Sequence, residues 1–160
     1  MKTLYIARHA KSSWDFPLLS DEERPLMEKG KKNTIKAAEF LLQKQVKIDV
    51  IISSHAVRAL ETAKIFARIL QYPQDQIMIT EQVYHASGDD LTDVLFELDD
   101  RYTSAMIVGH NPTMTDYLNR FLKQPVENFK TSGVACISFD TDQWAKIPLA
   151  KHKVNFITFV

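Results

Sequence analysis

Three short stretches of the sequence place arginine and histidine side chains at the ends of apolar runs. Arg8 and His9 stand side by side after the first run, Arg58 comes shortly after the second, and His110 follows a later one. Arginine carries planar, permanently charged donors that match the oxygens of a phosphoryl group. Histidine is one of the side chains that form covalent intermediates. Together these residue types suit a site that binds a tetrahedral oxyanion and stabilises its charge.

Such side chains need a scaffold, and the rest of the sequence predicts an α/β architecture in which apolar runs alternate with helical patterns. Runs rich in β-branched and apolar residues predict strands at 3–8, 48–54, 76–80, 104–110, 134–140 and 153–160. The sequence contains no internal repeat and no linker of domain size. We therefore expect a single domain over residues 1–160, with a mostly parallel central sheet flanked by helices on both faces.

Four segments between these runs carry apolar residues at helical spacing. The first helix is expected over 25–45, and the last follows Asn111 as N-cap and Pro112 as its first residue. Asp89 or Asp90 would cap the third helix. The predicted apolar faces are Ile35, Ala38 and Leu42; Ala56, Leu60, Ala63, Ala67 and Leu70; Leu91, Val94, Leu95 and Leu98; and Met114, Tyr117, Leu118 and Phe121.

The predicted topology brings the reactive side chains together. Ligands of open α/β sheets bind beyond the carboxyl ends of parallel strands, and three predicted strands end at or just before these residues. His9 is the candidate nucleophile because it follows a strand directly, and its imidazole must be neutral to attack. His110 would remain a donor to the phosphoryl oxygens. The helix start at Asn111 would favour an anion nearby.

The same residues carry a resemblance to a known family. ARHAKSSWD resembles the first motif of the histidine phosphatase superfamily, whose usual form is Arg-His-Gly. SSHAVRALETA (53–63) and VGHNP (108–112) resemble its second-arginine and second-histidine motifs, in the right order over essentially the whole chain. SDEERPLMEKG (20–30) and the short length are most similar to the SixA-type phosphohistidine phosphatases. The resemblance implies a phosphoglycerate mutase-like fold without a large cap.

The resemblance also implies a role for each matching residue. His9 would be the phosphorylated nucleophile, while Arg8, Arg58 and His110 would bind the phosphoryl group. In the first step His9 would attack phosphorus, and in the second step water would hydrolyse phospho-His9. The resemblance implies no metal and no organic cofactor.

Several positions near these motifs depart from the usual family pattern or belong to no motif. Ser12, Asp15 and Asn111 are the remaining candidates for substrate binding, and Asp15 stands where many relatives carry a phosphate-contacting Asn. Ala10 replaces the usual Gly, which requires a turn that tolerates a Cβ atom. The candidate general acid is Glu81, with His85, Asp89 and Asp90 as alternatives in the short connection that follows the third strand.

The favoured function is a phosphatase that removes phosphate from phosphohistidine on a protein. A small-molecule phosphomonoesterase and a non-catalytic phosphoprotein-binding module are the alternatives; binding alone would not need His9. A mutase would have to close its site against water. A departing imidazole nitrogen is basic and is protonated readily. The rate of phosphohistidine hydrolysis therefore depends less on a general acid than the rate of phosphate-ester hydrolysis, in which an alkoxide departs.

The composition limits the partners. Twenty basic and twenty acidic residues balance, so we expect binding to neither nucleic acid nor membrane. The single Cys136 excludes a disulfide within the chain and a cysteine-based zinc cluster. No charged-then-apolar leader opens the chain, and no apolar run approaches about 18 residues. We therefore expect a cytoplasmic monomer.

Overall fold

A six-stranded sheet forms the centre of the molecule in the computed structural model, which describes residues 1–158. The strand order is β3-β2-β4-β1-β5-β6. The strands are β1 (Lys2–Arg8), β2 (Val50–Ser54), β3 (Met78–Thr80), β4 (Ser104–Gly109), β5 (Val134–Phe139) and β6 (His152–Ile157). Pairs β1–β4, β4–β2 and β2–β3 are parallel, whereas β5 is antiparallel to both neighbours. The mostly parallel sheet is therefore confirmed; of the last predicted strand, residues 159–160 lie outside the described part.

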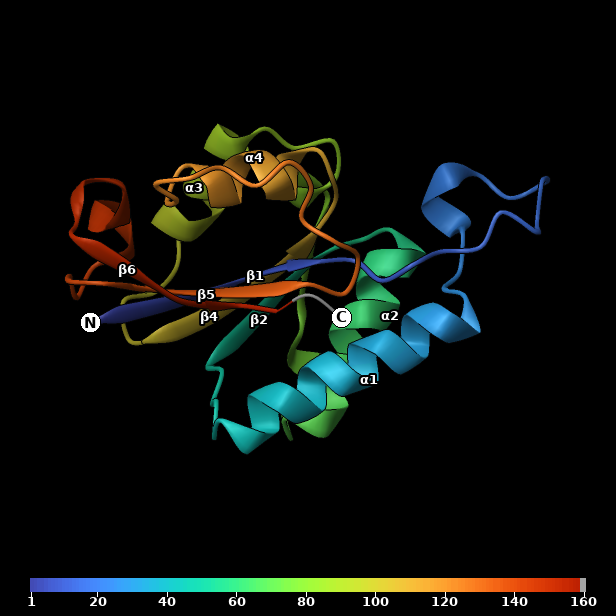
Figure 1. Cartoon of the computed structure of the whole chain (residues 1–160), viewed down its shortest axis with the longest axis horizontal. Coiled ribbons are helices and arrows are strands. Elements are labelled where there is room, and N and C mark those ends of the chain that lie inside the picture. Colours follow the sequence, from blue (N-terminus) through green and yellow to red (C-terminus); the bar gives the residue numbers. More distant parts are fainter. Residues whose placement is uncertain (159–160) are drawn as a thin grey trace.

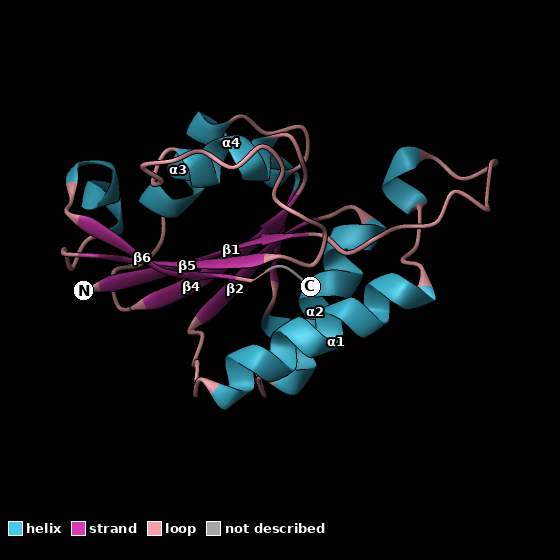
Figure 2. Ribbon diagram, in the orientation of Figure 1, coloured by secondary structure: helices cyan, strands magenta, loops and turns pink. Residues whose placement is uncertain are grey.

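Helices cover both faces of the sheet, as predicted (Figures 1 and 2). Helices α1 (Glu28–Gln43) and α2 (Val57–Ile69) lie on one face, and α3 (Gly88–Phe96) and α4 (Thr113–Asn119) lie on the other. Every residue of β2 and β4 is buried. Strands covered on both faces consist of continuous apolar runs rather than alternating ones, because neither face meets water.

Three helix predictions need correction. Helix α1 begins at Glu28, and its buried face is centred on Ala37, Ala38 and Leu41, whereas Leu42 is 49% exposed. The buried stripe is displaced because it also contains Thr34, whose hydroxyl donates to the Gly30 carbonyl. A prediction that counts only apolar residues misses Thr34, because its hydroxyl is hydrogen-bonded within the helix and can therefore be buried.

The N-termini of α3 and α4 also differ from the prediction. The N-cap of α3 is Ser87, and Asp90 is its capping-box partner three residues later. Helix α4 begins at Thr113, with Pro112 as the N-cap residue. The side chain of Asn111 still accepts the backbone N–H of Thr115 at 3.1 Å, so this amide donor is already used.

The segment that joins β1 to α1 extends beyond the end of the sheet and carries the short 3₁₀ turn η1 (Asp21–Glu23) (Figure 1). It returns to the sheet through an antiparallel bridge between Ser12 and Leu26. At Gly30 an added Cβ atom would lie 2.3 Å from the Lys11 carbonyl oxygen. A glycine is required there because helix and backbone approach so closely. Among the described residues, no helix is long and apolar enough to span a membrane.

Candidate active site

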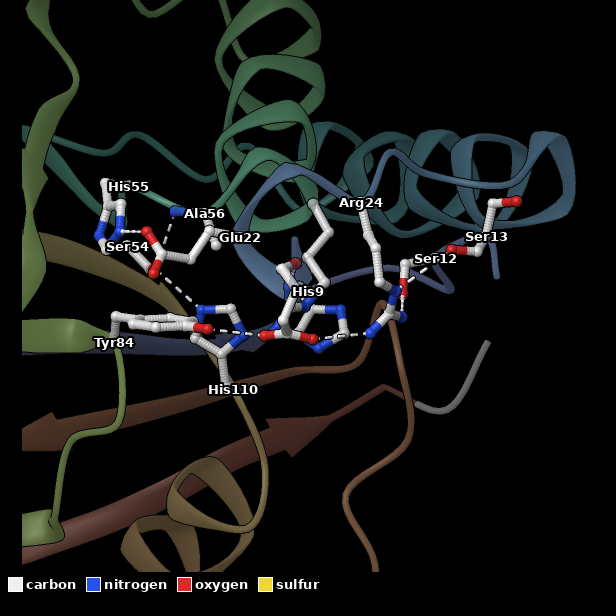
Figure 3. A network of polar contacts seen from close by, with 12 residues as sticks. His9, Ser12, Ser13, Glu22, Arg24, Ser54, His55, Ala56, Tyr84 and His110 are labelled. Atoms are coloured by element: carbon white, nitrogen blue, oxygen red, sulfur yellow. Dashed lines mark hydrogen bonds and ion pairs between the residues drawn. The ribbon is translucent and has the colours of Figure 1, made fainter. Parts of the chain in front are cut away.

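The carboxyl ends of β1, β2 and β4 bring the predicted reactive residues to one edge of the sheet. Arg8 is in register with Gly109 across the β1–β4 pair. The rings of His9 and His110 consequently lie with their centroids 5.0 Å apart. Figure 3 shows Tyr84, His110, His9 and Arg24 following one another across this edge.

The tautomer of His9 follows from one hydrogen bond. Its Nδ1 lies 2.7 Å from the carbonyl oxygen of Ala10. A carbonyl oxygen only accepts, so Nδ1 carries the hydrogen and Nε2 retains its lone pair. The ring is thus held with an unprotonated nitrogen available for attack.

The turn after His9 accommodates Ala10 without strain. Ala10 is fully buried, and its N–H donates to the Thr62 hydroxyl at 2.9 Å. The same hydroxyl donates to the Arg58 carbonyl at 2.7 Å, which ties the turn to α2. Non-glycine residues with positive φ among those described are Gln45, Gln71, His85 and Ser132. Ala10 therefore does not use the left-handed backbone that would require glycine.

His110 is oriented by Ser54, at the end of β2. Its Nε2 lies 2.8 Å from the Ser54 hydroxyl, which also accepts the Ala56 N–H. Since that hydroxyl has one hydrogen to donate, it can donate to Nε2, and Nδ1 then carries the ring hydrogen. The buried Nδ1 has no hydrogen-bond partner within the described chain. In that tautomer Nδ1 is an unused donor, and its ring lies beside His9.

Both histidines are kept neutral near pH 7. Burial, together with the charges of Arg58, Arg8 and Arg24, lowers the pKa of His9 to about 4, against a smaller upward effect of the bond to Ala10. Burial and the neighbouring His9 lower the pKa of His110 to about 3. Desolvation disfavours the charged imidazolium, and nearby guanidinium groups add like-charge repulsion.

Arg8 is anchored from one side only. Its Nη1 donates to the Phe129 carbonyl at 2.8 Å, and Asn128 lies nearby at 3.4 Å. Its buried Nε has no hydrogen-bond partner within the described chain. The Asn111 amide donates to the same two residues, at 3.0 Å to Asn128 and 3.3 Å to Phe129. Asn111 thus supports the loop that holds Arg8.

Arg58 is bonded to Asp21 of the β1–α1 segment, and Asp21 is in turn bonded to Arg24 and to Tyr84 of the β3–α3 connection. Its Nη2 donates to Asp21 Oδ2 at 2.9 Å. Arg24 Nη1 donates to the other carboxylate oxygen at 2.9 Å, and the Tyr84 hydroxyl donates to Oδ2 at 2.7 Å. These bonds lower the pKa of Asp21 to about 2, with the Tyr84 bond the largest contribution. Asp21 is therefore ionised at neutral pH.

A cavity of about 410 Å³ opens beside these side chains. Its lining residues are Asp21, Arg58, Tyr84, His85, Ala86, His110, Asn111, Pro112 and Thr113. Ring contacts of Tyr84 with His110 and His85, at centroid distances of 5.3 and 4.1 Å, form an aromatic wall. No group of three or more potential metal-ligating side chains occurs in the described part of the chain.

The structure brings Arg8, His9, Arg58 and His110 together as predicted from the sequence. The remaining candidates have different positions. Ser12 contacts the site only through Arg24, whose Nη2 donates to its hydroxyl. Asn111 lies in the cavity wall with its side chain already bonded.

Two candidates stand apart from this group. Asp15 is exposed, and its backbone N–H donates to the Ser13 hydroxyl. Glu81 is exposed in the 3₁₀ turn η3 (Glu81–Val83). Neither side chain is among those that line the cavity.

Sequence reasoning missed Asp21, Arg24 and Tyr84. The first two lie in an irregular segment whose position no periodicity predicts. The available signal was the charged run DEER (21–24) before the first helix. Tyr84 follows β3, a parallel neighbour of β2, so the rule for strand ends would have pointed to it.

The chain is similar in sequence and in fold to known proteins. The model of the histidine phosphatase superfamily (branch 1) matches residues 4–83. An uncharacterised protein of Mycobacterium leprae is 27% identical over 154 residues, which cover 89% of this chain and 92% of that protein.

Two solved structures resemble the whole fold. SixA from Agrobacterium tumefaciens has a TM-score of 0.81 and 24% identity, with 99% of this chain and 98% of that chain covered. The protein histidine phosphatase SixA complexed with tungstate has a TM-score of 0.80 and 20% identity, with coverages of 97% and 95%.

Proposed function

Because the chain belongs to the histidine phosphatase superfamily, we propose that it is a phosphatase with a phosphohistidine intermediate on His9 and a phosphohistidine-bearing protein as substrate. The observation that carries the proposal is the bond from His9 Nδ1 to the Ala10 carbonyl. That bond leaves Nε2 as a free nucleophile beside two arginines and a second histidine.

The reaction proceeds in two displacements. His9 Nε2 attacks phosphorus, the bond from phosphorus to the substrate nitrogen breaks, and that nitrogen keeps the electron pair and takes up a proton. Water then attacks phospho-His9, releasing inorganic phosphate and restoring the neutral imidazole. The unpartnered Arg8 Nε and His110 Nδ1, together with the Arg58 guanidinium, donate to the equatorial oxygens, where charge accumulates.

The proton supply of the site favours a basic leaving group. Asp21, the carboxyl group that reaches the cavity, is ionised because its pKa is about 2, and the sequence candidate Glu81 is exposed. General acid catalysis typically contributes 10²–10⁴-fold to a rate. An alkoxide leaving group needs that contribution, whereas the basic nitrogen of a phosphoramidate can be protonated from solvent.

The rim of the site favours a protein substrate. Trp14, Phe16 and Leu18 are 75%, 52% and 99% exposed, in the same segment that carries Asp21. Large exposed apolar residues in one short stretch are typical of a protein-binding surface. Asp15, Glu22 and the neighbouring Glu23 add negative charge to this rim, which suits a substrate with apolar and basic residues around the phosphohistidine.

The second candidate is a small-molecule phosphomonoesterase. The observation in its favour is the cavity of about 410 Å³ beside His110, which is large enough for a compact leaving group. Its proton donor would be His85, the alternative acid named from the sequence that also lines this cavity.

The two functions are separated by one comparison of substrates. Wild type and His9→Ala are incubated at neutral pH with EDTA, with a phosphohistidine peptide, free phosphohistidine, p-nitrophenyl phosphate and phosphoserine. We expect rapid phosphate release by the wild type from phosphohistidine and release at the uncatalysed rate by His9→Ala. His152→Ala, which alters a ring bonded to the Phe121 carbonyl, is the matched control. Equal activity of His9→Ala would refute the nucleophile, and release from esters alone would refute the phosphohistidine preference.

A further inference from the structure

The carboxylate of Asp21 occupies donors that a phosphoryl group would use. Arg58 donates to it from Nη2 at 2.9 Å and to the Asp21 backbone carbonyl from Nη1 at 2.6 Å. Arg24 and Tyr84 complete its contacts at 2.9 and 2.7 Å. Two guanidinium groups and a hydroxyl thus bind the Asp21 carboxylate in the way that arginine side chains bind phosphate oxygens.

The position of Asp21 makes it a neighbour of the reacting groups. It lines the same cavity as Arg58 and His110. A phosphoryl group placed between His9 and Arg58 would bring two anions onto one guanidinium. The Asp21 carboxylate and the phosphoryl group would then repel each other, and water screens this repulsion only weakly in a partly buried site.

Asp21 is the solvent-exposed partner in its ion pair with Arg58. The Asp21 side chain is 47% exposed, although Arg58 itself is only 8% exposed. The segment is held to the body by few side-chain bonds, including the 2.7 Å pair between Glu22 and His55. For Asp21 to leave, its bonds to Arg58, Arg24 and Tyr84 have to break.

We propose that Asp21 is an internal anionic ligand of the phosphoryl site, which holds Arg58 and Arg24 in the free protein, yields to the incoming phosphoryl group, and returns to displace the product phosphate. This inference rests on the proposed function, because it takes the Arg58 site to be the phosphoryl site. By competing with phosphate, Asp21 weakens product binding and shortens the time that product blocks the site.

The structure supplies a reporter for this exchange. The Trp14 ring stacks on the Arg24 guanidinium at 3.4 Å, so a change in the contacts of Arg24 changes the surroundings of Trp14. The only other tryptophan, Trp144, is 1% exposed and donates to the Tyr102 carbonyl. A fluorescence change on phosphate binding that is lost in Trp14→Phe can therefore be assigned to Trp14.

The test is a titration with inorganic phosphate, followed by calorimetry and by Trp14 fluorescence. We expect Asp21→Asn to bind phosphate about tenfold more tightly than wild type, because one like charge is removed. Asp75→Asn is the matched control: it removes one exposed carboxylate in the 3₁₀ turn η2 (Gln74–Gln76), which precedes β3 and so lies at the edge of the sheet away from the site, and it should leave the affinity unchanged. Tyr84→Phe loosens Asp21 without touching its charge and should tighten phosphate binding a few-fold.

Equal or weaker binding by Asp21→Asn and Tyr84→Phe would overturn the inference, since Asp21 would then position the arginines instead of competing with phosphate. Arg58→Ala tests the underlying site separately. If wild type binds phosphate and Arg58→Ala binds it equally well, the phosphoryl site of the proposed function is wrong. If only Arg58→Ala loses binding, that site stands and the Asp21 variants decide the inference alone.

Discussion

At His9, the hydrogen-bond partner of Nδ1 decides whether Nε2 is free to act as the nucleophile. The Ala10 carbonyl fixes the hydrogen on Nδ1, and burial with nearby arginines keeps the ring neutral. At His110 the partner is a hydroxyl, Ser54, which can donate and accept. The two imidazole rings are chemically identical. The hydrogen-bond partner of each ring therefore decides which histidine is the nucleophile and which is the donor.

The first prediction concerns pH. The pKa of His9 is lowered from 6.5 to about 4, so the fraction of neutral, nucleophilic His9 stays high until the pH falls towards 4. We expect kcat/KM for a phosphohistidine peptide, corrected for the uncatalysed rate, to be flat from pH 8 to about 5 and to fall below that. The quantity reports the free enzyme. A fall with an apparent pKa near 6.5 would contradict the assignment.

A second prediction concerns the orientation of His110. Ser54→Ala removes the partner of Nε2 and should lower kcat/KM by about 10–100-fold, less than outright loss of an oxyanion donor, which typically costs 10²–10³-fold in kcat. Ser53→Ala is the control, because the Ser53 hydroxyl donates only to the neighbouring Ser54 carbonyl. Similar losses in both variants, measured beside thermal unfolding, would point to a general packing effect.

At the scale of elements, the segment between β1 and α1 does most to shape the site. It supplies Asp21 and Arg24, and it is held near the sheet by the bridge between Ser12 and Leu26. Its close approach to α1 depends on Gly30.

Gly30→Ala should therefore damage both stability and activity. The new Cβ would meet the Lys11 carbonyl oxygen at 2.3 Å, and relief requires a backbone shift two residues after His9. We expect a loss of about 1–3 kcal/mol in unfolding free energy and a lower kcat. Gly88→Ala is the control, because its Cβ would meet the end of the Arg120 side chain, which can move aside. Equal effects of the two substitutions in urea unfolding and turnover would refute this role of Gly30.

The exposed part of the same segment should affect protein substrates selectively. Leu18→Ser removes a side chain that is 99% exposed. We expect it to raise KM several-fold for a phosphohistidine peptide with flanking apolar and basic residues, and to leave free phosphohistidine unaffected. Leu149→Ser, equally exposed at 94% but in the 3₁₀ turn η4 (Trp144–Leu149) near the opposite end of the sheet (Figure 1), should change neither. Parallel changes for both substrates would contradict a docking role.

At the scale of the whole molecule, the sequence predicts the sheet and the four residues at its edge because both depend on local pattern. Parallel strands align their carboxyl ends, so Arg8, His9, Arg58 and His110 could be grouped without a structure. The position of Asp21 could not be predicted in this way. Its partners Arg58 and Tyr84 are 37 and 63 residues away, and the segment that carries it follows no period. The buried face of α1 shifted for a related reason, because Thr34 is buried by a bond that hydropathy does not register.

The central claim is that the reaction passes through phospho-His9, and direct trapping of that intermediate tests it. Wild type is mixed with excess phosphohistidine peptide, quenched in alkali within milliseconds, and mapped by mass spectrometry and phosphorus NMR. The structure predicts up to one phosphoryl group per chain, on Nε2 of His9, formed at least as fast as turnover and absent in His9→Ala. Phosphate on His110 instead, or full turnover with no phosphoenzyme on His9, would contradict it.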